Sequence, residues 1–415
     1  MIIELPKRLN PLIDTLMQNG IRPVLVGGYL RDILLKNSHS KDIDIELYGL
    51  ENIQELIKML TPFANPHEVG KSFGVIKLFF EGYDIDFSLP RTEDKIASGH
   101  KGFAIKTYYD IAFEKAALRR DFTINAMGYD CKDKKLLDPF HGQDDLKNRI
   151  LACVNSKTFI QDPLRLFRAL GFCARFSLTC KPELIRLCKS MYANNSLSSL
   201  PKERIFEELK KLLLRSQNPS IGLRLLQEMQ SLAFFPQLNA LGKKQFDKNL
   251  IMLDNLAQTV IEDEKLKLHL LFGVLVLGFK TKQEVLDFIL SLSEDKKLLS
   301  NVSSLYEGYH SLNSFTFCDA NIRRLALHVR IEYLHILTSV DTDKSIKKLG
   351  EQIYQRSIHL QVSTQPPKAL LQGRHLLSLG LQASQKFSEL LSEAYEAQLD
   401  GEFFTLQEAK EWLKL

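Results

Sequence analysis

Apolar and polar residues in the first third of the chain follow patterns that predict both strands and helices. The runs at 75–80 (VIKLFF) and 83–89 (YDIDFSL) predict strands, and the pattern over 53–60 predicts a helix. Residues 1 to about 20 predict an amphipathic helix that ends near Asn19-Gly20, a common helix-stop signal. Strands that alternate with helices in this way indicate an α/β or α+β domain.

The pattern changes farther along the chain. The stretch at 90–103 (PRTEDKIASGHKGF) is polar and has no periodicity, so we expect a loop, and loops of this length are usually disordered or functional. Strand signals become rare after Asp138-Pro139-Phe140, and from about Asp162 one helical pattern follows another to the end. The expected fold is therefore a mixed α/β head followed by an all-α remainder.

The stretch from Val24 to Glu46 carries the first candidate chemistry. It predicts a strand, a Gly27-Gly28 turn, a short helix and a second strand with Asp42 and Asp44. Side chains two apart in a strand share a face, so the two carboxylates can hold a divalent metal together, and the glycines let backbone N–H groups approach an anion. The pattern indicates a site for a metal-bound triphosphate. Acidic residues on an edge strand beside a simple chain reversal are the alternative.

A second polar cluster is RRDFTINAM at 119–127. Two adjacent arginines could grip a phosphate, and Asp121 and Asn125, four apart on a helical turn, could reach a ribose. The alternative is that Asp121 caps a helix and that the arginines lie on the surface.

A third cluster is Gln161-Asp162-Pro163-Leu164-Arg165. Asp before Pro is an ordinary helix start, with Asp162 as the N-cap. Asp162 and Arg165 are also three apart and offer an acceptor beside a donor. Such a pair matches the amino group and ring nitrogen of cytosine and adenine and rejects uracil and guanine.

Composition narrows the class of protein. A length of 415 residues predicts two to four domains, and a net charge of +5 is compatible with a nucleic-acid partner or with a solvated basic surface. The six cysteines form no C-x-x-C pair, so neither a zinc site nor a disulfide framework is expected. The N-terminus does not resemble a signal peptide and the apolar run at 270–279 is too short to span a membrane, so we expect a cytoplasmic protein without a membrane partner.

Taken in order, these motifs resemble those of class II tRNA nucleotidyltransferases, the CCA-adding enzymes. The resemblance covers roughly residues 20–240 and returns near 366–412. It rests on the Gly27-Gly28-x-Leu30-Arg31-Asp32 run, Asp42-x-Asp44, RRDFTINAM, DPFHGQDDLKNRI at 138–150, QDPLRLFRALGFCARF at 161–176 and LPKERIFEELKKLL at 200–213.

The resemblance implies an α/β nucleotidyltransferase head at 1–152 followed by an all-α neck at 153–215, body at 216–305 and tRNA-binding tail at 306–415. It implies addition of CCA to the tRNA 3′ end from CTP and ATP, with release of pyrophosphate and without a nucleic-acid template. Addition of the final A alone is the first alternative, poly(A) synthesis the second, and an RNA-binding protein that has lost catalysis the most remote.

The resemblance also assigns residues. Two Mg²⁺ ions would be held by Asp42 and Asp44, with Asp86 as a supporting carboxylate or an exposed edge residue. The triphosphate would be bound by Gly27, Gly28 and Arg31, and the ribose by Asp121 with Arg120 and Asn125. The base would be bound by Asp162 and Arg165, and Arg168 is a further nucleotide-binding residue. A spring between head and neck would consist of Asp138, Gly142 and Asp145.

Departures from the family pattern separate the alternatives. Gln161 stands where the family has Glu, which leaves open how firmly Arg165 is held. Glu68 and Ser72 break the pattern of bacterial poly(A) polymerases, and the loop at 92–103, with Gly99 and Gly102 as hinges, favours addition of CCA or A.

The helical half carries two further expectations. His269 lies among apolar residues without a paired His-Asp, so we expect a satisfied core histidine and no phosphohydrolase activity. Basic residues spread over helices suffice to bind the tRNA acceptor arm and elbow by shape and phosphates. Plausible contacts, none distinguishable from ordinary solvated residues, are Lys347, Lys348, Arg356 and Arg374.

Overall fold

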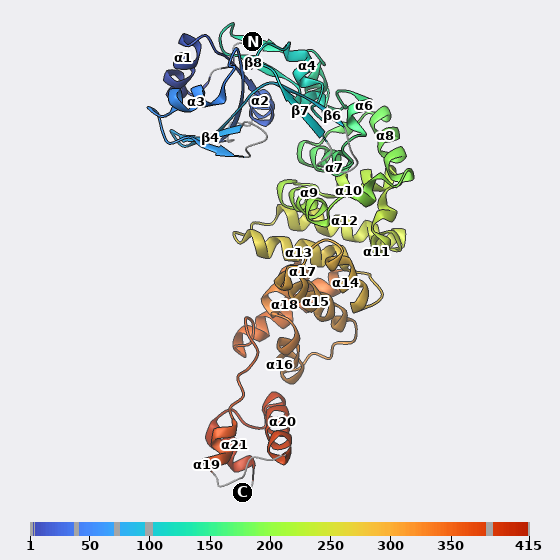
Figure 1. Cartoon of the computed structure of the whole chain (residues 1–415). Helices are drawn as coiled ribbons and strands as arrows, with labels where there is room; N and C mark the ends of the chain where they lie inside the picture. Colours follow the sequence, from blue (N-terminus) through green and yellow to red (C-terminus); the bar gives the residue numbers. More distant parts are fainter. Residues whose placement is uncertain are drawn as a thin grey trace. The chain divides into compact units, whose positions relative to one another are not determined.

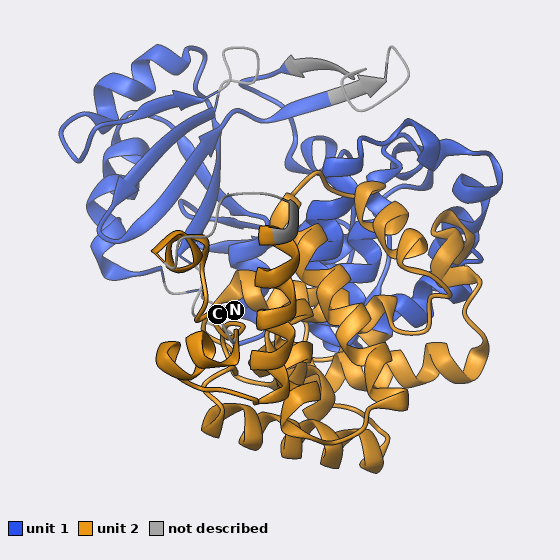
Figure 2. Ribbon diagram, turned by 90° about the horizontal axis from the view of Figure 1, so that it is seen from below, with its two compact units in different colours: residues 1–212, 221–231 blue, residues 213–220, 232–415 orange. Residues whose placement is uncertain are grey.

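The computed structural model describes residues 3, 5–36, 41–69, 75–95, 103–378 and 385–413. The chain forms two compact units (Figure 2): unit 1 comprises residues 1–212 and 221–231, and unit 2 comprises residues 213–220 and 232–415. The finer division into head, neck, body and tail stays a prediction.

Unit 1 is organised around a mixed sheet (Figure 1), which has the strand order β3-β4-β5-β2-β1-β8-β9 in the described residues. Strands β2 and β5 pair in parallel, and the remaining neighbours pair antiparallel. The strands are β1 (Arg22–Val26), β2 (Asp42–Tyr48), β3 (His67–Val69), β4 (Val75–Phe80), β5 (Tyr83–Ser88), β8 (Gly128–Asp130) and β9 (Lys135–Leu137). The strands predicted at 75–80 and 83–89 are therefore present.

Short helices accompany the sheet: α1 (Asn10–Gln18), α2 (Gly28–Leu34), α3 (Ile53–Leu60) and α4 (Phe113–Ala117). Helix α3 has its predicted bounds. Helix α1 stops before Asn19-Gly20 as predicted but begins only at Asn10, after a 3-10 turn at Lys7–Leu9, with a proline in its first turn. Proline lacks the N–H that a helix interior needs, so a helix tends to start there.

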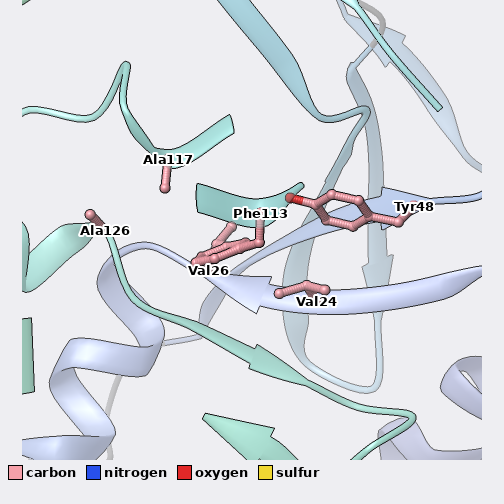
Figure 3. Packing of buried hydrophobic residues seen from close by; sticks show 6 residues of the cluster. All are labelled: Val24, Val26, Tyr48, Phe113, Ala117 and Ala126. Atoms are coloured by element: carbon pink, nitrogen blue, oxygen red, sulfur yellow. The ribbon is translucent and has the colours of Figure 1, made fainter. Parts of the chain in front are cut away.

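Packing of α4 on the sheet sets the position of the residues that follow it. Figure 3 shows Phe113 and Ala117 of α4 beside Val24 and Val26 of β1 and Tyr48 of β2, in one buried cluster. A Cβ at Gly128 would lie 2.6 Å from the Phe113 ring, so glycine is required for this close contact. The segment after Ala117 is thereby held over β2.

The prediction of a loop throughout 90–103 is wrong at both ends of that stretch. Strand β6 (Arg91–Lys95) pairs antiparallel with β7 (Phe103–Thr107), and residues 96–102, with Gly99 and Gly102, lie outside the described residues. A two-stranded ladder satisfies its backbone groups by cross-strand hydrogen bonds, so a stretch without hydrophobic periodicity can still form it.

The rest of unit 1 is mainly helical. A short parallel pair, β10 (Ile150–Leu151) and β11 (Thr179–Cys180), lies between helices. The helical segments are the 3-10 turn η2 (Thr123–Asn125), α5 (Gly142–Lys147), α6 (Ser156–Phe159), α7 (Leu164–Phe176), α8 (Pro182–Ala193), η3 (Ser196–Ser199), α9 (Lys202–Arg215) and α10 (Ser220–Glu228).

Unit 2 is helical over its described residues, as expected from the pattern after Asp162. Its elements are η4 (Leu232–Phe234), α11 (Pro236–Asn239), α12 (Lys243–Gln258), α13 (Glu264–Val276), α14 (Lys282–Leu290), α15 (Lys296–Ser311), η5 (Leu312–Ser314), α16 (Asp319–His328), α17 (Ile331–Ser339), α18 (Lys344–His359), α19 (Gly373–Ser378), α20 (Gln385–Asp400) and α21 (Leu406–Trp412). The mixed sheet and the long helical remainder confirm the predicted fold class.

Two further expectations meet the structure here. His269 on α13 lies 2.9 Å from the Asn301 amide through Nδ1, which confirms a satisfied core histidine, and all six cysteines are free. None of the helices in the described part of the chain has the length and apolar character needed to cross a membrane.

Candidate active site

The predicted nucleotide-binding residues lie around one cavity of about 780 Å³ within unit 1. Its lining comes from the β1–α2 turn, β2, the 119–125 segment, α7 and α9, and includes Gly27, Gly28, Arg31, Asp44, Arg120, Asp121, Asn125, Asp162, Arg165 and Arg168. A second cavity, of about 550 Å³, is lined by Asp42, Asp44, Lys77, Asp84 and Asp86, among others. Asp44 lines both, so the two predicted groups of residues meet at this carboxylate.

The turn between β1 and α2 requires glycine at position 27. Gly27 has φ +74° and ψ −142°, a conformation that side chains strongly disfavour. A Cβ at this position would also lie 2.8 Å from Oδ2 of Asp44. The missing side chain is what lets the turn and the carboxylate lie side by side.

The carboxylates come from two neighbouring strands. Asp42 and Asp44 alternate with buried isoleucines on β2, and the parallel register places Asp86 of β5 beside Asp44. Asp86 also forms an ion pair with Lys77 of β4, Nζ lying 2.8 Å from Oδ2. Partial burial raises the pKa of Asp44 above its ordinary value, although Arg120 offsets part of the rise.

These residues fit a divalent metal that is completed by substrate. Among the described residues no group of three or more His, Cys, Asp or Glu is placed to hold a metal by itself. Mg²⁺ in nucleotide sites is typically held by one or two carboxylates, water and substrate phosphates. Asp42 and Asp44 supply such carboxylates, and the raised pKa of Asp44 shows that its charged form lacks full compensation from protein groups.

Glu46 is a residue of the site that the sequence analysis misses. It is 1% exposed, and its Oε1 lies 2.8 Å from an Nη2 of both Arg119 and Arg120, while the Tyr48 hydroxyl donates to Oε2 over 3.1 Å. Burial alone would raise the pKa of Glu46, but the two arginines outweigh it and hold the pKa below its ordinary value. The period-two pattern of Asp42 and Asp44, continued for one more step, points to Glu46 and is the signal that was available.

The alternative of surface arginines at 119 and 120 is therefore wrong. Their side chains are only 18% and 13% exposed. Arg120 also donates from Nη1 to the Asn125 carbonyl over 3.2 Å. Both arginines line the cavity while one nitrogen of each is bound to Glu46.

Asp121 is buried, and both of its oxygens accept hydrogen bonds. Oδ1 accepts from the Phe122 N–H over 2.8 Å and from the Asn125 amide over 3.0 Å, and Oδ2 accepts from Nε of Arg168 over 2.7 Å. Burial would raise the pKa of Asp121, but Arg168 and Asn125 bring it below the ordinary value. The expected helical turn is a 3-10 turn that begins at Thr123, and Asp121 does not cap it.

Arg31 lines the same cavity as Asp121 and Asn125. It is 4% exposed, donates from Nη1 to Oδ1 of Asn125 over 2.7 Å, and forms an ion pair with Asp32 at 2.7 Å. Its guanidinium carbon lies 4.5 Å from the centre of the Phe176 ring. Arg31, Asn125 and Asp121 thus form a continuous network of polar side chains.

Asp162 and Arg165 stand at the start of α7. Helix α7 begins at Leu164 with Pro163 as its N-cap, so the prediction of Asp162 as the N-cap is wrong by one residue, although Oδ1 of Asp162 accepts the Leu164 N–H over 3.2 Å. Arg165 donates from Nη1 to the Thr158 carbonyl over 3.0 Å and from Nη2 to the Arg119 carbonyl. Two backbone carbonyls therefore help to hold the guanidinium in place.

The proposed spring residues make local contacts within unit 1. Asp138 accepts the backbone N–H groups of Gly142, over 2.7 Å, and Gln143, over 2.9 Å. Asp145 accepts the Thr123 hydroxyl over 2.7 Å. These contacts tie α5 to the RRDFTINAM segment.

Helix α9 adds a wall to which the sequence analysis gives no role. Glu203, Arg204, Glu208 and Lys211 line the cavity, and Lys211 forms an ion pair with Glu208 at 2.8 Å. In unit 2, Lys347, Lys348 and Arg374 are exposed. Arg356, by contrast, is bound to Asp319 through two hydrogen bonds of 2.7 and 2.6 Å.

Two parts of the chain match known protein families. Residues 24–152 match the family described as the poly A polymerase head domain. Residues 181–241 match the one described as the probable RNA and SrmB-binding site of polymerase A.

Curated relatives match about half of the chain. The chain is 39% identical over 226 residues to the multifunctional CCA protein of Aliivibrio salmonicida, a match that covers 52% of this chain and 51% of the relative. It is 40% identical over 221 residues to the CCA-adding enzyme of Blochmanniella pennsylvanica, with 52% and 51% covered. The chain thus spans about half the length of the curated relatives it matches.

Solved structures resemble nearly the whole chain. A CCA-adding enzyme in its apo form I has a TM-score of 0.73 at 21% identity, with 99% of this chain and 94% of that chain covered. A CCA-adding enzyme in complex with CTP has a TM-score of 0.72 at 22% identity, with 98% and 95% covered. The Thermotoga maritima CCA-adding enzyme complexed with tRNA-CCA has a TM-score of 0.63 at 21% identity, with 99% and 96% covered.

At this identity the structures establish the fold, and the sequence matches establish the head domain and the RNA-binding segment. Residues 24–152 thus match a poly A polymerase head domain, residues 181–241 match the probable RNA and SrmB-binding site of polymerase A, and the fold is that of solved CCA-adding enzymes.

Proposed function

We propose that this protein is a template-independent tRNA nucleotidyltransferase that adds CCA to the tRNA 3′ end from CTP and ATP and releases pyrophosphate. The observation that carries the proposal is the meeting, at Asp44, of a two-carboxylate strand with the cavity that contains every predicted nucleotide-binding residue. The names of the curated relatives and the CTP and tRNA complexes of the structural relatives support it.

In this proposal Asp42 and Asp44 hold two Mg²⁺ ions. The ions would supply charge neutralisation at the phosphates and lower the pKa of the attacking tRNA hydroxyl. The chain's own residues position the reactants: the glycine turn brings backbone N–H groups to the phosphates, and Arg120, in the same cavity wall, adds positive charge. Asp86, which forms an ion pair with Lys77, is the supporting carboxylate beside Asp44 on the neighbouring strand.

Recognition of the sugar follows from the network around Asp121. Because its oxygens already accept hydrogen bonds from Asn125 and Arg168, we assign Asp121 the task of orienting those two side chains toward the ribose. Arg168 is 34% exposed at its side chain, so it can reach a bound nucleotide while it stays paired.

Recognition of the base falls to Asp162 and Arg165. The carboxylate accepts from the exocyclic amino group that cytosine and adenine share, and the guanidinium donates to the adjacent ring nitrogen. Arg165 has Nη1 and Nη2 bound to carbonyls, so its orientation is fixed before the nucleotide arrives. Uracil and guanine would leave these groups unpaired, which is a strong basis for rejection.

Incubation with tRNA that lacks its CCA end, Mg²⁺ and labelled nucleotides tests the activity. CTP and ATP together should give a discrete extension of three nucleotides, and ATP alone should add one nucleotide to tRNA that ends in CC. Addition of A only to the second substrate would identify an A-adding enzyme, and a long ladder would identify a poly(A) polymerase. Incorporation of neither nucleotide would refute the enzyme.

The control for this assay is Asp42→Ala. We expect loss of all additions with tRNA binding retained, since the proposed RNA contacts lie elsewhere; wild-type turnover would contradict metal catalysis at this residue. The proposed compartment is the cytoplasm, and the six free cysteines fit its reducing conditions.

A further inference from the structure

The face of β2 that carries the metal-binding carboxylates continues into a buried charge cluster. Glu46 follows Asp44 by two residues and pairs with Val24 of β1, whereas Asp44 pairs with Val26. Both side chains therefore extend from one rigid strand in the middle of the sheet. Because the two residues are only two positions apart on β2, a shift of the strand at Glu46 also moves Asp44.

Glu46 holds the two arginines through a single oxygen. Oε1 accepts from Arg119 and Arg120 at 2.8 Å each, and the second oxygen is occupied by the Tyr48 hydroxyl. Hydrogen bonds between ionised partners in a buried site are strong and directional. This one carboxylate therefore anchors one nitrogen of each guanidinium group.

Arg119 connects this cluster to the base-reading residue. Its side chain binds Glu46, and its backbone carbonyl accepts the hydrogen bond from Nη2 of Arg165. A single residue thus joins a strand of the sheet to the guanidinium at the start of α7. Arg120 makes a parallel connection, since its Nη1 donates to the carbonyl of Asn125, whose side chain is bound to Asp121.

We propose that Glu46 is a positioning residue that fixes Arg165 relative to the catalytic strand, acting through the side chain and the carbonyl of Arg119. The inference rests on the proposed function, because base selection by Arg165 is part of it. Glu46 touches no reactant in this scheme. Its role is to keep the base-reading guanidinium at a fixed distance and orientation from the metal-binding carboxylates. Only a nucleotide whose base is correctly bound then places its α-phosphate at Asp42 and Asp44.

Glu46→Gln is the most discriminating substitution. It keeps the volume and one oxygen acceptor but removes the charge that holds two guanidiniums. We expect kcat/KM for CTP and ATP to fall about tenfold and the selectivity over UTP to fall by a similar factor, the size typical of couplings between residues in one network. A merely structural ion pair would lower the amount of folded protein without changing selectivity.

Asp341→Asn is the matched control. Asp341 is also a buried carboxylate that accepts from a cation and a tyrosine hydroxyl, with Lys248 Nζ at 2.9 Å and Tyr309 as the partners, but it belongs to unit 2. Its substitution should lower thermal stability to a comparable extent and leave the ratio of CTP to UTP incorporation unchanged.

The experiment measures single-nucleotide incorporation on tRNA lacking CCA, with CTP and UTP in separate reactions, for wild type and both variants. Lower selectivity in Glu46→Gln, with wild-type selectivity in Asp341→Asn, supports the proposal. Unchanged selectivity in Glu46→Gln, beside an active wild type, overturns it. An inactive wild type instead refutes the proposed function.

Arg119→Gln keeps the test decisive if Glu46→Gln fails to fold. This variant keeps the backbone carbonyl that Arg165 uses but removes the charged bond to Glu46. It should show the same loss of selectivity, and wild-type selectivity in Arg119→Gln would overturn the proposal.

Discussion

Gly27→Ala should separate backbone strain from damage to the metal site. Alanine at the φ and ψ of Gly27 costs about 1–3 kcal/mol of stability. Its Cβ would also lie 2.8 Å from Oδ2 of Asp44, where ordinary contacts begin at 3.4 Å, so the carboxylate must retreat by about 0.6 Å. Mg²⁺ requires oxygen ligands at about 2.1 Å in near-octahedral geometry, and misplacement of about 1 Å can lower a rate about 100-fold. We expect kcat to fall by roughly one to two orders of magnitude.

Gly20→Ala is the control for strain alone. Gly20 has φ +79° and nothing within 4 Å of the position of a Cβ, so alanine there is strained without a clash. Both variants should lose thermal stability by a few degrees, at about 2–4 °C per kcal/mol. Only Gly27→Ala should show a lower rate of CTP and ATP incorporation per folded molecule. Equal kcat in the two variants, measured at matched folded concentration, would refute the contact argument.

Three further substitutions test other parts of the site. Asp121→Asn should cost about 2 kcal/mol at pH 7, less than a fully buried pair because Arg168 is partly exposed. The pKa of Asp121 in the folded protein lies below its ordinary value of 3.8, so the extra stability of wild type over Asp121→Asn is complete above pH 3.8 and is lost as pH falls through the folded pKa. Urea unfolding at several acidic pH values measures this, and a difference in unfolding free energy that does not change with pH would contradict it. Arg165→Ala should abolish discrimination or incorporation of both nucleotides while tRNA binding, measured by filter retention, stays near wild type; unchanged kinetics would contradict base reading. Gly142→Ala should destabilise by about 1–3 kcal/mol because its Cβ would lie 2.2 Å from the Thr123 carbonyl, and an unchanged melting temperature would show that α5 can shift freely.

Local patterns in the sequence were enough to predict the strands and the turn that carry Asp42, Asp44 and Gly27. The period-two spacing of Asp42 and Asp44 predicted their common face on β2. The close approach of backbone N–H groups to an anion at Gly27 and Gly28 stays a prediction, and the contact of Gly27 with Asp44 was not foreseen. The pairing of β6 with β7 could not be predicted in this way, because the sequence RTEDK at 91–95 shows no alternation of apolar and polar residues.

Contacts between distant segments were beyond reach of the sequence alone. A buried glutamate is rare unless it is paired, and the two arginine partners of Glu46 lie more than 70 residues along the chain. Likewise, Asp121 lines the cavity, and its expected contact with a sugar stays a prediction, but the hydrogen bonds that it accepts from Asn125 and Arg168 could not be read from the sequence. Sequence patterns indicate which residues carry polar chemistry, whereas the division of that chemistry between ligand and protein partners depends on tertiary contacts.

The carbonyl anchors of Arg165 bear on how this site can change over generations. Every residue has a backbone carbonyl, so substitution at 119 or 158 leaves the acceptors of Arg165 in place as long as the chain path is kept. These two anchors therefore depend on the path of the backbone and not on the identity of a side chain. A change in the backbone path at 119 or 158 would move the anchors of Arg165 without any change in the residues of the base-reading pair.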